Sequence, residues 1–188
     1  MEKVLLKQYV KNITVESGKI IAKNYGIILN DNETKLIITF LKKHIDELDE
    51  LRRIATLFET ETAYSRLPIA ELSSRISKKV NEPYKEWLTS LSNSLHRESQ
   101  ETLAYIWERE ASDLVENLSL TEEEENDLKT LGIQIGNYNI QMQENAFRWY
   151  ARQLEDRRIK LAEEVSEKQR LCNSLGVLTG IFLVILLI

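Results

Sequence analysis

The amino-acid sequence predicts an all-α protein: an antiparallel bundle of about six helices, the last of which continues into a C-terminal transmembrane helix. The chain has only six glycines and two prolines in 188 residues, too few for a turn-rich β fold. Apolar residues recur at the three- and four-residue spacing of amphipathic helices along most of its length. All 25 basic and 30 acidic residues precede Leu171, so that residues 171–188 carry no charge.

The first thirty residues form a separate basic segment. Lys3, Lys7 and Lys11 share one face of a predicted helix, and residues such as Leu6 and Val10 share the other. A basic amphipathic helix of this kind can lie on an anionic membrane surface. Packing against the bundle is the alternative, and the pattern supports both equally.

The first long helix is expected to begin at Asp31 or Asn32, either of which can cap it, and to stop before Leu67-Pro68. A histidine on its apolar stripe is far more often a satisfied or rim residue than a ligand. The stripe consists of Ile37, Leu41, His44, Leu48, Leu51, Ala55 and Phe58.

Three shorter helices are expected next. Pro68 suits the first turn of a helix that runs to about Lys79, and Asn81 with Pro83 repeats this start signal. His96, near the end of the following helix, suits the negative end of the helix dipole. The third and fourth helices are marked by Tyr84, Leu88, Leu91 and Leu95, and then by Leu103, Trp107, Leu114 and Leu118.

The fifth helix should begin with a capping box, in which Thr121 and Glu124 each satisfy a backbone N–H group of the other. The acidic run at residues 122–125 is therefore interpreted as a helix start, not as a metal site. The spacing of Gly132 and Gly136 predicts a close helix crossing followed by a helix end.

One long last helix is predicted from about Asn139, because no helix breaker occurs between that residue and the uncharged tail. As a helix, residues 171–188 would span about 27 Å, near the ~30 Å hydrocarbon thickness of a bilayer. Basic residues precede this anchor and none follows it, which places residues 31–170 in the cytoplasm as a helical-bundle domain. Gly176 and Gly180 are candidates for membrane helix packing in a homo-oligomer.

The composition argues against several classes of function. One cysteine excludes a disulfide framework and a cysteine-rich zinc module, and the net charge of −5 gives no basic footprint for nucleic acid. No Ser/His/Asp set, phosphate-binding glycine loop or metal-ligand spacing can be assembled. The sequence therefore predicts no enzyme, no catalytic residue, no metal or cofactor site, and no titratable pair facing into the bundle.

Several motifs occur in an order and spacing that resemble the stage III sporulation protein AB family, a relative of the type II secretion system F domain. The resemblance covers the chain from about Ala22 to its end. The acidic segment FETETAYSRLPI ends the first long helix and supplies Glu59, Glu61, Tyr64 and Pro68. The later motifs are Trp107-Glu108, the LGIQIG run from Leu131 to Gly136, Gln143, Leu154-Glu155, and the terminal Ser-Leu-Gly segment with its apolar span.

The resemblance implies a cytoplasmic bundle attached to the mother-cell membrane of a spore-forming bacterium. By analogy with the secretion F domain, it would be a platform between a secretion-type ATPase and other membrane proteins of the mother cell to forespore channel. The sequence departs from the family pattern at Thr62, where an aliphatic residue is usual, at Leu67 and at Asn139. It also lacks an apolar run before Ala22 that is long enough for the family's N-terminal span, so a single C-terminal anchor in membrane lipid is expected.

Two interpretations of the acidic segment remain open. Glu59, Glu61, Tyr64 and Pro68 are the candidate partner-binding residues; alternatively, the segment is a helix corner in which Tyr64 packs and both glutamates are solvated. At the level of the whole chain, a tail-anchored membrane-fusion or tethering protein is the competing function. That function needs an unbroken zipper of roughly eight heptads, whereas the apolar stripe reaches back from the tail only to about Ile140.

Overall fold

The computed structural model describes the backbone of residues 31–97, 101–136 and 139–187, and the side chains of residues 38–97, 101–136 and 139–166. Within these ranges it contains six helices and no strand, which confirms the predicted all-α class. The predicted segment 1–30 lies outside the described residues. The helices are α3 (Asp31–Ser65), α4 (Ile69–Ser77), α5 (Tyr84–His96), α6 (Leu103–Val115), α7 (Glu122–Gly136) and α8 (Ile140–Leu187).

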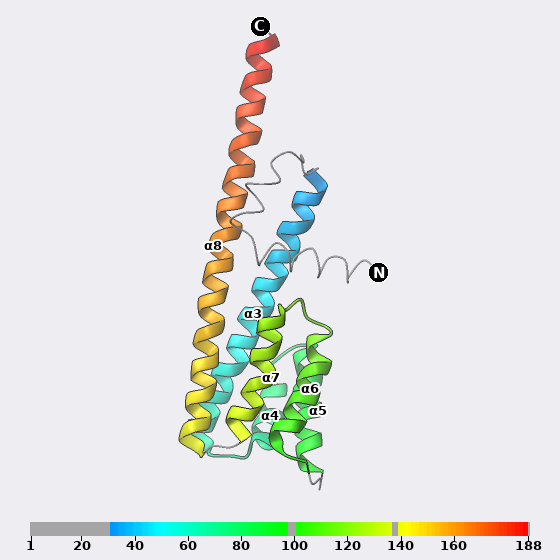
Figure 1. Ribbon diagram of the computed structural model, residues 1–188, viewed down its shortest axis with the longest axis vertical. Coiled ribbons are helices and arrows are strands. Elements are labelled where there is room, and N and C mark those ends of the chain that lie inside the picture. Colours follow the sequence, from blue (N-terminus) through cyan, green and yellow to red (C-terminus); the bar gives the residue numbers. More distant parts are fainter. Residues whose placement is uncertain (1–30, 98–100, 137–138, 188) are drawn as a thin grey trace.

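The two longest helices, α3 and α8, form the frame of the molecule. They run antiparallel and make the most extensive contact between any two helices, while the four short helices pack beside the lower half of this pair (Figure 1). The buried face of α3 matches the predicted stripe, since Leu41, Leu48 and Phe58 are almost fully buried. The amphipathic pattern of the sequence therefore determines which face of each long helix points inward.

Three ion pairs give the register of the α3–α8 pair. From one ion pair to the next, the residue number on α3 falls by seven and then by three, and the residue number on α8 rises by the same amounts. This pattern is expected for straight antiparallel helices. The pairs are Glu59 with Arg148 at 2.7 Å, Arg52 with Glu155 at 3.1 Å, and Asp49 with Arg158 at 3.7 Å.

Aromatic rings from four helices meet in the centre of the bundle. Phe58 of α3 stacks on Phe147 of α8 with 4.8 Å between ring centroids, and Trp87 of α5 meets the ring of Trp107 of α6 edge-on at 5.4 Å. The predicted close crossing in the fifth helix is confirmed, because a Cβ atom at Gly132 would lie 2.5 Å from the Trp107 ring. The glycine lets α6 and α7 approach each other closely.

The predicted capping box is present at the start of α7. The backbone N–H of Thr121 donates to Glu124 Oε2 at 2.7 Å, and the backbone N–H of Glu124 donates to Thr121 Oγ1 at 3.3 Å. His96 lies in the last turn of α5, and its Nδ1 is 2.7 Å from the carbonyl oxygen of Ser92. Both local predictions are confirmed because capping depends on residues close in sequence.

Two helices end earlier than the sequence predicts. Helix α4 ends at Ser77 instead of near Lys79, and α6 ends at Val115 although Leu118 continues the apolar series. Leu118 is nevertheless buried, because the chain turns after α6 and its N–H donates to the Val115 carbonyl at 3.2 Å. The spacing of apolar residues alone does not distinguish the last turn of a helix from a buried, non-helical turn that follows the helix.

Helix α8 continues without a break from Ile140 to Leu187 and extends well past the rest of the bundle (Figure 1). Among the residues that the structure describes, no helix has both the length and the apolar character needed to cross a membrane. The side chains of residues 167–188 lie outside the described part. The anchor at 171–188 and the packing roles of Gly176 and Gly180 therefore stay predictions.

Candidate functional site

The corner between α3 and α4 carries the sequence-predicted contact residues. Tyr64, one residue before the end of α3, has 88% of its surface exposed. Arg66 follows with a backbone φ of 51°, a left-handed conformation that is unusual for a residue with a side chain. Pro68 then occupies the N-cap position of α4 and is itself exposed. The corner thus presents an aromatic ring on a tightly turned segment.

The two candidate glutamates are held by cations from outside α3. Glu59 accepts a hydrogen bond from Arg148 Nε of α8 at 2.7 Å, and Arg148 also pairs with Glu144. Glu61 accepts a hydrogen bond at 2.7 Å from Lys79, which follows α4. This bond, together with the nearby Arg75, lowers the pKa of Glu61. The segment therefore splits into two acids that join helices and a tyrosine that faces outward.

These positions agree with neither interpretation in full. The corner alternative, with Tyr64 packed and both glutamates solvated, is wrong because the ring is exposed and the acids are paired. In the contact interpretation, the structure leaves Tyr64 and Pro68 available to a partner. Glu59 and Glu61 lie beside them, but their charges are already neutralised by Arg148 and Lys79.

A buried hydrogen-bonded pair of titratable residues lies in the core, where the sequence predicted none. His44 Nε2 is 2.9 Å from Glu124 Oε2, and both residues are at least 94% buried. Burial opposes the charged form of Glu124, but His44 and the Thr121 groups stabilise that form and lower its pKa. The expectation of no inward-facing titratable pair is wrong, because the two residues come from helices eighty positions apart in sequence.

The same region contains further buried polar groups. Glu47, three residues after His44, is 6% exposed and accepts the backbone N–H of Ser119 at 2.8 Å. The hydroxyl of Tyr150 is buried without a hydrogen-bond partner, and burial raises its pKa. None of these residues lines either of the two surface pockets described below. The arrangement joins helices in the core and gives a ligand no access.

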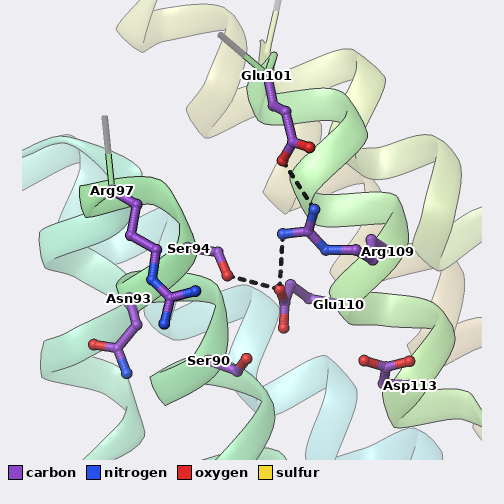
Figure 2. Close-up of a pocket in the computed structure, with 8 residues that line it drawn as sticks. All are labelled: Ser90, Asn93, Ser94, Arg97, Glu101, Arg109, Glu110 and Asp113. Carbon is purple, nitrogen blue, oxygen red and sulfur yellow. Dashed lines mark hydrogen bonds and ion pairs between the residues drawn. The ribbon is translucent and has the colours of Figure 1, made fainter. Parts of the chain in front are cut away.

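The larger surface pocket, of about 620 Å³, lies between α5 and α6 (Figure 2). In its centre the carboxylate of Glu110 accepts hydrogen bonds from Ser94 at 2.8 Å and from Arg109 at 3.2 Å, and Arg109 also donates to Glu101 at 2.9 Å. Burial opposes ionisation of Glu110, but hydrogen bonds from its neighbours outweigh this effect and lower its pKa. The full lining is Ser90, Asn93, Ser94, Arg97, Glu101, Arg109, Glu110 and Asp113.

The chemistry of this pocket is that of a polar joint between two helices. No described lining residue is a histidine or a cysteine, and the one buried acid is already bonded to neighbours on both helices. The second pocket, about 300 Å³, lies over the α3–α8 ion pairs and includes Glu59 and Arg148. Across the described residues, no three His, Cys, Asp or Glu side chains are grouped so that they could hold a metal ion.

The fold defines the class of protein: an all-α bundle built on an antiparallel pair of long helices, one of which extends past the bundle. The family model for stage III sporulation protein AB matches residues 36–188. The chain belongs to the stage III sporulation protein AB family. Members of this family are structural components of sporulation, and the family is not a known enzyme family.

Two individual relatives agree with this assignment. The stage III sporulation protein AB of Bacillus subtilis (strain 168) is 24% identical over 141 residues, which cover 75% of this chain and 82% of the relative. A solved structure of stage III sporulation protein AB matches with a TM-score of 0.59 and 20% identity, over 65% of this chain and 96% of the solved one. The second match concerns the fold, because its sequence identity is low.

Proposed function

We propose that this protein is a membrane-anchored structural component of the channel between mother cell and forespore. It acts there as a platform between a cytoplasmic secretion-type ATPase and other membrane proteins of the same complex. The observation that carries the proposal is the family match, which extends from residue 36 through the uncharged tail at 171–188. The body lies on the cytoplasmic side of the mother-cell membrane, because the basic residues all precede the tail.

The architecture supports a platform role in one further way. Helix α8 contributes to the core through Phe147 and Leu154 and then continues as the same helix to Leu187. A helix needs a proline, a glycine or an inserted group to kink, and residues 140–175 contain neither proline nor glycine. A continuous helix of this kind joins the bundle directly to the proposed anchor.

The competing function, tail-anchored membrane fusion or tethering, is less well supported. A fusion zipper needs a long helix with a free apolar face. Here the apolar face of α8 is occupied by α3 and α7 within the same chain, with Tyr150, Leu154 and Leu161 buried. Helix α8 also begins only at Ile140.

The anchor is tested by deleting residues 171–188 and fractionating sporulating cells. The full-length protein should sediment with membranes and resist extraction by high salt, while the deletion variant should be soluble. Retention of the deletion variant in the membrane fraction would argue against the proposed anchor and would point to residues 1–30.

Within the anchor, Gly176→Leu should weaken self-association in detergent if the two glycines pack helices together.

The ATPase contact is tested at Tyr64, which makes no buried contact that its loss would disturb. Charge reversal at Glu59 or Glu61 is less informative, because it would also repel Arg148 or Lys79 and change the bundle. Full-length protein with Tyr64→Ala should lose co-purification with the sporulation ATPase, and should melt at the same temperature as the wild type. Ile159→Ala, at another exposed apolar residue on α8, is the matched control and should bind normally. Equal binding by all three proteins would refute the contact.

A further inference from the structure

The exposed apolar side chains of the described residues are concentrated at one end of the molecule. Among the residues whose side chains are described, seven large hydrophobic side chains are exposed, and six of them lie within nine residues of a helix end at the lower tip in Figure 1. Only Ile159 lies far along a helix. The six are Tyr64 at 88%, Tyr105 at 54%, Trp149 at 54%, Ile133 at 51%, Met142 at 49% and Ile140 at 41% exposed.

Hydrogen bonds and close contacts place these helix ends together. The side-chain amide of Gln143, in the first turn of α8, donates to the Ile135 carbonyl in the last turn of α7 at 2.8 Å. A Cβ atom at Gly136 would lie 3.4 Å from the backbone nitrogen of Ala104, at the start of α6. The register of the α3–α8 ion pairs brings Met142 level with the end of α3. We define the distal tip surface as Tyr64, Ile133, Ile140 and Met142.

The sequence between the last turns of α7 and the first turn of α8 is unusual for the chain. Residues 130–143 carry no charged side chain, the longest such run before Leu171 in a protein that is 29% charged. Depletion of charge, together with exposed tyrosine and methionine, is characteristic of the core of a protein–protein interface. Exposed apolar side chains gathered at one end of an otherwise charged molecule are typical of a contact site.

We propose that the distal tip surface binds a soluble protein, through an uncharged apolar contact bordered by carboxylates of that protein. The carboxylates would face Arg66, an exposed cation beside Tyr64 that makes no ion pair within the described part of the chain. This inference rests on the proposed function for the direction of the molecule, since residues 171–188 are taken as the anchor.

The geometry argues against lipid and against a second copy as the occupant. Met142 and Leu171 are separated by 29 residues of one helix, or about 44 Å at 1.5 Å per residue, so the tip is far from a bilayer that begins near Leu171. Two copies anchored in one membrane stand side by side with their tips pointing the same way, so they cannot meet head-on at this surface. A soluble protein is the occupant that can reach this surface.

Site-specific photocrosslinking of the full-length protein in sporulating cells tests this proposal. A photoreactive phenylalanine analogue is placed at Met142, at Tyr64 or, as a control on the outer face of α8, at Asp156. We expect the first two positions to form an adduct with one and the same soluble protein, identified by mass spectrometry, and Asp156 to form none. Adducts only with lipid or a second copy, no adduct from either tip position, or equal labelling from Asp156 would overturn the proposal.

A second arm uses the adduct formed from Tyr64. Met142→Asp or Ile140→Asp should lower its yield about tenfold, because either change buries a charge in an apolar contact. Ile159→Asp is the matched control and should leave the yield unchanged, and circular dichroism should show the same helix content in all variants. Unchanged yield in both tip variants would contradict the proposal. A crosslinked partner that is soluble but is not the ATPase would support the proposed contact at the distal tip surface and would contradict the proposed role as an ATPase platform.

Discussion

The indole ring of Trp107 fills the space that a side chain at residue 132 would need. A Cβ atom built on Gly132 lies between 2.5 and 2.7 Å from three atoms of Trp107. The ring itself cannot move freely, because its Nε1 donates a hydrogen bond to the Leu128 carbonyl at 2.8 Å and it packs against Trp87. Two motifs that are far apart in sequence, Trp107-Glu108 and the LGIQIG run, thus meet in one contact.

Gly132→Ala should therefore destabilise the protein. Alanine gains about 1 kcal/mol in helix propensity, but overpacking of a core commonly costs more, so we expect a net loss of about 1–2 kcal/mol in the free energy of unfolding. Urea unfolding of the full-length protein in detergent measures this change. Gly136→Ala is the control, because its Cβ would meet nothing closer than 3.4 Å. A more stable Gly132→Ala protein would show that the α6–α7 crossing can open.

Thr62→Val should stabilise the protein by about 1 kcal/mol. The Thr62 side chain is 1% exposed and its hydroxyl has no hydrogen-bond partner, so folding removes this group from water without compensation. Valine has nearly the same shape and is also β-branched. Thermal unfolding of the two proteins gives the difference, and Thr56→Val, at an exposed position, should change little. A lower melting temperature for Thr62→Val would indicate a partner for the hydroxyl.

Glu124→Gln should destabilise the protein in a pH-dependent way. The pKa of Glu124 is lowered from its ordinary 4.5 in the folded state, so its ionised form contributes stability above that value and loses this contribution as the pH falls through the folded pKa. We expect the variant to lose about 2 kcal/mol at pH 7, and the difference from wild type to shrink below about pH 4.5. Urea unfolding across this range measures it. A constant difference would show that ionised Glu124 does not stabilise the fold, and Glu116→Gln, at an exposed acid, should show no difference.

Arg157→Gln should cost about 1–2 kcal/mol in the free energy of unfolding. Arg157 of α8 is 19% exposed and pairs with Asp127 at 2.6 Å and Glu123 at 2.7 Å, both on α7. The change would leave the partly buried Asp127 without its cation. The control is Arg152→Gln on an exposed part of the same helix, which should stay within about 0.5 kcal/mol of wild type. Equal effects of the two changes would mean that the α7–α8 ion pairs contribute nothing specific.

The helices and their caps were predictable because they depend on neighbouring residues. The stripe through Leu48 and Phe58, the capping box at Thr121 and the end of α3 before Leu67-Pro68 all follow from spacing within a few turns. The crossing at Gly132 was also predicted, although its partner, Trp107, was not.

The candidate site was predictable only in part, for a physical reason. Whether Glu59 is solvated or paired depends on the register of α3 against α8, which brings Arg148 to it across 89 residues of sequence. The same holds for His44 and Glu124, which a single helix pattern cannot relate to each other. The exposure of Tyr64 depends on which parts of the chain pack beside the end of α3, and the residues around it give no clear sign of that packing.

The unbroken α8 has a mechanical consequence. A helix resists twisting about its own axis, and residues 140–175 offer no glycine or proline at which the rotation could be absorbed. A partner that turns the first turn of α8 about the helix axis would therefore pass this rotation on to the helix near residue 175, once the ion pairs to α3 give way. Helix α8, packed along α3, would thus transmit torque applied at Met142 toward the proposed anchor.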